Sequence, residues 1–159
     1  MVAQLLLFLE EGVRAYNQEY LDKAFSDRDI NWEVKEEIEN EFRNTVKAIK
    51  EILDLSQDII LSKTRLKNQA DFYSLFGAIA ELNREDDKFI IIKDISERIN
   101  NFLKVVGDAE LKNKSRDLLT EYQRNALDYY EAVKFSFTDA GTRKTRIKIM
   151  KSVIQGKIN

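Results

Sequence analysis

The sequence contains 159 residues, of which 43% are hydrophobic and 34% are charged, a balance typical of a soluble globular protein. It has no Cys and no His, which excludes disulfides, thiolate zinc sites, cysteine nucleophiles, imidazole metal sites and Ser-His-Asp chemistry. The net charge is -2, so the chain as a whole lacks the basic character of a nucleic-acid-binding protein. The absence of Pro and the presence of only 5 Gly predict a structure that is almost entirely helical.

The first predicted helix, over residues 1–13, is apolar nearly all round, because apolar side chains occupy successive positions as well as positions at helical spacing. Such a helix is normally buried on more than one face. Two interpretations stay open: the segment is the central helix of a complete domain, or its partner lies outside this chain. Under the second interpretation, a missing half or a protein partner covers four apolar side chains, Leu5, Leu6, Phe8 and Leu9.

No apolar run in the sequence approaches the ~20 residues needed to span a bilayer. The longest run, from Leu5 to Leu9, has no basic segment before it and no small-residue cleavage site after it, so it does not resemble a signal peptide. With no Cys in the chain either, we expect a cytoplasmic protein without membrane contact.

Apolar periodicity and capping residues predict six further helical segments. They cover residues 17–25, 32–55, 68–82, 92–106, 118–134 and 139–156. Between the second and third of them, Asp58–Leu61 fits either a short strand or a buried connector. The predicted fold class is therefore all-α, an irregular antiparallel bundle of about six or seven helices in a single domain over residues 1–159.

Carboxylates are plentiful on the segment 32–55, but they do not form a convincing metal site. Di-metal helical bundles normally use Glu-x-x-His pairs that point inward, and this chain has no His. Charge along a helix usually marks its solvated face, so we expect Glu37 and Glu41 to be solvated. No catalytic residue, metal ligand or cofactor is predicted.

Two basic segments are candidate phosphate- or nucleic-acid-binding sites. In the first, Arg65 and Lys67 precede a predicted helix start at Asn68, where free N–H groups attract anions. The alternative is a capped helix start in which Arg65 pairs with a nearby acid, and the sequence favours that alternative.

The second basic segment holds Arg143 and Arg146, which are three residues apart and therefore share a helix face, together with Lys144 and Lys148. This set fits a phosphate, whether of a nucleotide or of a nucleic-acid backbone. Two arginines on one face equally fit an anchor for buried carboxylates of the fold. Both interpretations stay open.

Several segments resemble one bacterial family. The run from Thr64 to Phe76 resembles a family phrase of the form Arg-(Phe/Leu)-Lys-Asn-x-x-Asp-Phe-Tyr-x-Leu-Phe, and Ala78–Leu82 supplies the Glu-Leu that follows it. The opening Val2–Leu7 with Glu11-Gly12, and the late Arg143-x-x-Arg146, are also similar to family positions. The family is the ParB-like domain of unknown function at the N-terminus of GmrSD-type modification-dependent restriction enzymes.

The resemblance implies a helical module without its catalytic partner. Family members carry an N-terminal ParB-like α/β half with an Asp-Gly-Gln-Gln-Arg motif, which is linked to nucleotide binding and hydrolysis, and no such motif occurs here. We therefore expect a fragment that is similar to the helical half. Its expected role is non-catalytic support of nucleotide-dependent DNA restriction or phage defence. The alternatives are a nucleic-acid-binding domain that uses the basic C-terminal helix, an uncharacterised structural or interaction domain, and a stand-alone carboxylate enzyme.

Overall fold

The computed structural model describes residues 1–55, 63–85, 91–135 and 138–158. These residues form seven α-helices and three short 3-10 helices, and they contain no strand. The α-helices are α1 Val2–Glu11, α2 Gln18–Ile30, α3 Lys35–Asp54, α4 Gln69–Glu85, α5 Lys93–Gly107, α6 Glu121–Lys134 and α7 Ala140–Ile154. The 3-10 helices are η2 Arg65–Lys67, η3 Leu111–Asn113 and η4 Arg116–Leu118. The prediction of an all-α bundle of six or seven helices is confirmed, whereas Asp58–Leu61 lies outside the described residues.

Local side-chain hydrogen bonds fix several helix boundaries. Asn17 caps α2 by accepting a hydrogen bond from the backbone N–H of Tyr20, and Asp139 caps α7 in the same way. Thr120 and Gln123 form a reciprocal capping box at the start of α6. The sequence predicts that α6 begins at residue 118, three residues before its actual start at Glu121. It also predicts that α2 ends at residue 25, but the helix continues through the polar run after Phe25 to Ile30.

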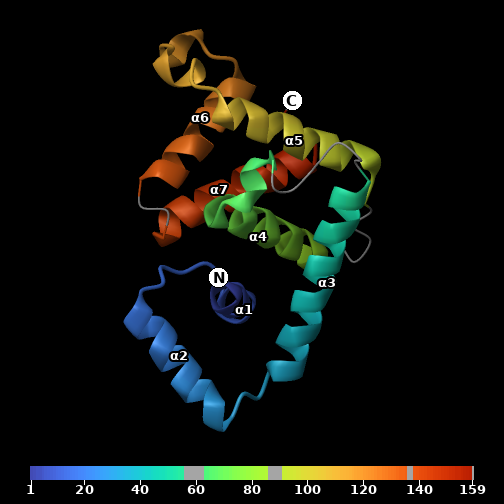
Figure 1. Ribbon diagram of the computed structural model, residues 1–159, viewed down its shortest axis with the longest axis vertical. Coiled ribbons are helices and arrows are strands. Elements are labelled where there is room, and N and C mark those ends of the chain that lie inside the picture. Colours follow the sequence, from blue (N-terminus) through green and yellow to red (C-terminus); the bar gives the residue numbers. More distant parts are fainter. Residues whose placement is uncertain (56–62, 86–90, 136–137, 159) are drawn as a thin grey trace.

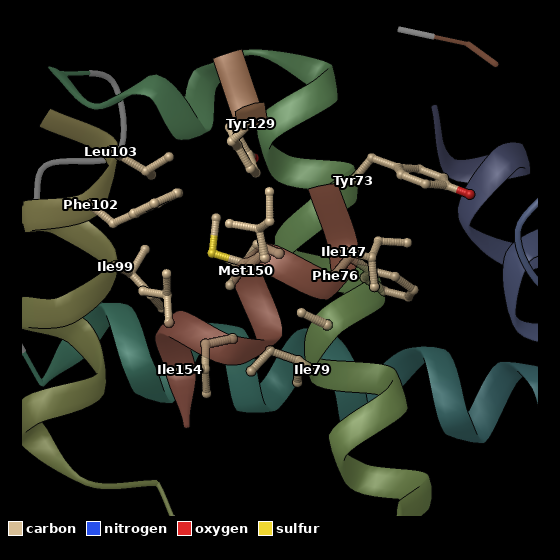
Figure 2. Packing of buried hydrophobic residues seen from close by; sticks show 14 of the residues in the cluster. Tyr73, Phe76, Ile79, Ile99, Phe102, Leu103, Tyr129, Ile147, Met150 and Ile154 are labelled. Carbon is tan, nitrogen blue, oxygen red and sulfur yellow. The ribbon is translucent and has the colours of Figure 1, made fainter. Parts of the chain in front are cut away.

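The centre of the bundle is the contact between α4 and α7, with α3, α5 and α6 packed around them (Figure 1). Phe76 and Ile79 from α4 meet Met150 from α7 with no side-chain exposure above 1%. Figure 2 shows Phe102 of α5 and Tyr129 of α6 closing the same cluster, and their rings lie edge to face with centroids 5.5 Å apart. The densest core therefore surrounds the helix that carries the predicted arginine pair.

The first helix is enclosed by this chain, which corrects the expectation that a partner covers it. Leu5, Phe8 and Leu9 are only 2–3% exposed and belong to the main core, because α3 and α4 pack against α1. Arg84 of α4 also donates a hydrogen bond to the carbonyl oxygen of Leu9 at 2.5 Å. Of the four side chains assigned to a partner, only Leu6 remains partly accessible.

In contrast, α2 lies at the edge of the molecule and buries little (Figure 1). Its one fully buried side chain is Ala24, which forms a small separate cluster with Leu7 and Tyr16. Arg28 of α2 reaches back to α1, where its guanidinium lies 2.8 Å from a Glu10 oxygen and 2.7 Å from a Glu11 oxygen. Ion pairs and a small satellite cluster hold this helix.

Candidate functional site

Arg143 and Arg146 lie on the inner face of α7 and are 2% and 1% exposed. The prediction that they share a helix face is confirmed, but that face is turned into the protein. Lys144 and Lys148, on the other side of the same helix, are exposed. The structure therefore separates the four basic residues of this segment into a buried pair and a solvated pair.

Arg146 is hydrogen-bonded to neutral oxygens of two neighbouring helices. Its Nε donates to the Ser74 hydroxyl of α4 at 3.2 Å, and its Nη1 donates to the carbonyl oxygen of Ala132 in α6 at 2.5 Å. The Ser74 hydroxyl in turn donates to the carbonyl oxygen of Ala70 at 2.7 Å. Burial lowers the pKa of Arg146, and the positive charge of Arg143 lowers this pKa further.

Arg143 occupies an aromatic box next to the first helix. Its guanidinium carbon lies 4.5 Å from the ring centre of Tyr73 and 5.0 Å from that of Tyr16. Nη1 donates to the carbonyl oxygen of Arg14 at 3.2 Å, and Nη2 donates to the Gln4 side-chain oxygen at 3.1 Å. The Nε atom is buried and has no hydrogen-bond partner among the residues the structure describes.

Asp71 of α4 is the buried acid of this region, with 0% exposure. Arg65 lies 3.2 Å from it, and the Asn68 amide donates to it at 3.2 Å. Burial raises the pKa of the Asp71 carboxyl, and Arg65 and Asn68 oppose that shift. The prediction that Arg65 pairs with a nearby acid at a helix start is confirmed.

A small cavity of about 30 Å³ lies where α1, α4 and α7 meet. Its walls are Gln4, Tyr73, Arg143 and Arg146, and Met1, Gln69 and Ala70 complete it. Figure 2 shows that the Tyr73 hydroxyl points away from the apolar core towards α1. That hydroxyl approaches Arg143, but it is buried without a properly oriented hydrogen bond among the described residues. The cavity thus brings together two buried guanidinium groups and a phenol.

The remaining predicted site residues do not join this cavity. Lys67, Lys144 and Lys148 are exposed, and none of the three lines this cavity. Arg65 lines a separate open cleft of about 320 Å³ between η2 and α5, together with Lys63 and Lys104. The six predicted basic residues therefore belong to three different environments.

Sequence reasoning missed Gln4, Ser74 and Tyr73 as members of the network. Ser74 and Tyr73 stand in the segment that resembles the family phrase, but only the basic residues of that segment were predicted to bind. Arg143 of α7 follows Gln4 by most of the chain length, so no local pattern in the sequence connects these two residues.

Among the described residues, no three acidic side chains are grouped so that they could hold a metal ion. No helix in the same ranges is long and apolar enough to cross a membrane. Comparisons with protein-family models, with curated proteins and with solved structures found no match to this chain.

Proposed function

We propose that this chain is a non-catalytic helical module of a ParB-like, GmrSD-related protein that supports nucleotide-dependent DNA restriction or phage defence. One observation carries the proposal. The two segments that resemble family positions, Thr64–Phe76 and Arg143–Arg146, are distant in sequence, yet they pack against each other through the Arg146–Ser74 hydrogen bond and the Arg143–Tyr73 contact. Residues that share one structural task in this way are expected to recur together in a family.

The buried arginines favour a structural and binding role over chemistry. Arg146 donates hydrogen bonds to a hydroxyl and to a carbonyl oxygen of the chain itself, and these bonds position helices. Cys and His, the usual nucleophile and the usual general base, are absent from the sequence. The proposal therefore assigns hydrolysis to a separate ParB-like α/β half.

The geometry disfavours DNA binding through Arg143 and Arg146. Both guanidinium groups are at most 2% exposed and engaged inside the bundle, so a phosphate backbone on the outer face of α7 meets only Lys144 and Lys148. Affinity for duplex DNA requires several such phosphate contacts. We accordingly place no DNA on this helix.

A partner half has a better candidate surface on the outside of α1 and α2 than on the buried leucines. There, Leu6, Phe25 and Trp32 line an apolar cavity of about 170 Å³, and Phe25 is 50% exposed. Ile30, at the end of α2, is 93% exposed. Exposed apolar side chains beside an apolar cavity are typical of protein contacts. We propose that the ParB-like half covers this surface.

The test mixes the purified chain with a separately expressed ParB-like α/β half that carries the Asp-Gly-Gln-Gln-Arg motif. We expect the chain alone to hydrolyse no nucleotide, and the two together to co-elute in gel filtration with an altered rate of nucleotide hydrolysis. Ile30→Asp should abolish co-elution. Leu118→Asp is the matched control, because Leu118 is 75% exposed on η4. Hydrolysis by the chain alone, or no effect of the chain on the half, would contradict the proposal.

A further inference from the structure

The cavity between α1, α4 and α7 has the chemistry of an anion site. Its walls contribute two guanidinium groups, those of Arg143 and Arg146, and no carboxylate. Arg143 is 2% exposed, and its hydrogen bonds to Arg14 and Gln4 leave its charge without an acidic partner among the described contacts. Burying a cation without an opposing charge is costly, so an anion at this point would lower the free energy of the folded state.

Two unused donors lie on the cavity wall. The Nε of Arg143 and the hydroxyl of Tyr73 are both buried without a hydrogen-bond partner in the described part of the chain, and Tyr73 is only 4% exposed. Buried polar atoms of this kind are rare in folded proteins, and an unpaired one commonly marks a place where a water or a ligand binds. Both atoms belong to residues that face the same cavity.

The start of α4 adds a third set of donors. Gln69 and Ala70 are the first two residues of this 17-residue helix, and both line the cavity. Backbone N–H groups in the first turn of a helix have no partner within the helix, and the helix dipole favours negative charge there. The unpaired Tyr73 hydroxyl and the unpaired Arg143 Nε are independent of this helix end and lie on the same cavity.

The arrangement of donors selects the shape of the anion. The Nη1 of Arg143 already donates to Arg14 and the Nη2 to Gln4, whereas the Nε has no acceptor among the described residues, so a ligand meets this guanidinium at its Nε edge. Single donors approach instead from the Arg143 side chain of α7, the Tyr73 side chain of α4 and the first turn of α4, which suits the several oxygens of a tetrahedral group. The volume of about 30 Å³ exceeds the ~10–15 Å³ needed for one water, and the exposed residues Met1 and Gln69 stand at its rim. The cavity therefore suits the end of a group whose remainder lies outside.

We propose that this cavity binds a single phosphate group, held by the Arg143 Nε, the Tyr73 hydroxyl and the first turn of α4. The proposal does not depend on the assignment to a ParB-like protein. A free phosphate ion and the terminal phosphate of a nucleotide share this chemistry, and the experiment separates them.

The test measures binding by isothermal titration calorimetry and thermal unfolding, with inorganic phosphate, AMP and acetate as probes in chloride buffers of matched ionic strength. We expect phosphate to raise the Tm, and AMP to bind at least as tightly if the ester end fits the rim. Binding of inorganic phosphate without binding of AMP would identify the free ion as the ligand. A Tm unchanged by both phosphate probes, or an equal rise with acetate, would overturn the proposal.

The informative variant is Tyr73→Phe, which removes only the unpaired hydroxyl. The ring remains to pack against Arg143 and against Phe8, whose centroid lies 5.8 Å away, so the variant should fold. We expect phosphate affinity to fall about tenfold, the usual effect of losing one hydrogen bond to a charged group. Tyr122→Phe is the control, because Tyr122 is a half-buried tyrosine that lies against Phe102, outside this cavity. Equal phosphate affinity in the two variants would contradict the assignment.

Discussion

Two arginines, Arg146 and Arg28, join helices in opposite ways. Arg146 is 1% exposed at the α4–α7 contact, where it donates to the Ser74 hydroxyl and to the Ala132 carbonyl oxygen, and burial lowers its pKa against a smaller raising by the charge of the buried Asp71. Arg28 connects α2 to α1 near the surface, where two carboxylates neutralise it and burial is incomplete. The first arrangement places a costly charge in the densest part of the core, whereas the second leaves a charge pair where water screens it. The central contact should therefore be intolerant of change, and α2 should open separately.

Arg146→Ala should show the largest effect. It removes the hydrogen bonds to Ser74 and Ala132 and leaves a void in the core, so we expect a loss of about 3–5 kcal/mol in the free energy of unfolding. Urea denaturation followed by circular dichroism measures it. Lys148→Ala, on the exposed face of the same helix, is the control and should change stability by less than ~0.5 kcal/mol. Equal effects of the two substitutions would show that Arg146 is not buried.

Gly77→Ala tests how closely α4 and α7 approach. A Cβ atom at this position would lie 2.6 Å from Cδ1 and 2.9 Å from Cγ1 of Ile147, which is itself 1% exposed. Although alanine is the better helix former, the clash should dominate and destabilise the protein by about 1–3 kcal/mol. Thermal unfolding of the variant checks the sign. A stabilised variant would mean that the two helices are farther apart.

Asp71→Asn tests the buried acid through the pH dependence of stability. Burial raises the pKa of Asp71 above its ordinary 3.8, so the folded state binds a proton at this site more readily than the unfolded state does. The stability that this carboxyl contributes is fully present below pH 3.8 and is lost as the pH rises through the raised value. The unfolding free energy of the wild type, minus that of the variant, should therefore fall as the pH rises. A difference that grows with pH would indicate that the Arg65 pairing dominates.

Arg28→Ala should have the smallest effect on global stability. Exposed and partly exposed ion pairs contribute about 0.2–1 kcal/mol, and α2 buries only Ala24 completely. We expect hydrogen exchange in the α2 amides to become faster while exchange in α4 and α7 stays unchanged. Lys23→Ala is the control, because the ion pair of Lys23 is with Asp27 on the same helix and connects no second helix. A cooperative loss of protection in all helices would contradict the separate behaviour of α2.

The helices were predictable from the sequence because their signals are local. Apolar spacing and capping residues located the seven α-helices of the described residues, and the predicted start of the last segment at residue 139 coincides with the N-cap of α7. The start of α6 was placed too early because the capping box of Thr120 and Gln123 was overlooked beside an apolar Leu118–Leu119 pair. The burial of Leu5, Phe8 and Leu9 by the chain itself was left open, because an all-round apolar helix looks the same whichever molecule covers it.

The site was only partly predictable, because burial decides what an arginine does. The spacing of Arg143 and Arg146 gave their shared face, but a basic run looks alike whether that face points to solvent or to the core. The identities of their partners, Gln4 and Ser74, depend on how α1 and α4 pack against α7. Such contacts are non-local, so sequence spacing alone carries no information about them.

Side-chain hydrogen exchange of the arginines tests the burial of the α7 pair most directly. In nitrogen-15 NMR spectra, assigned with Arg143→Lys and Arg146→Lys, we predict that the Nε–H protons of these two residues exchange at least roughly tenfold more slowly than that of Arg124, which is exposed on α6. Exchange of all three at the same fast rate would place the pair in solvent and contradict the account.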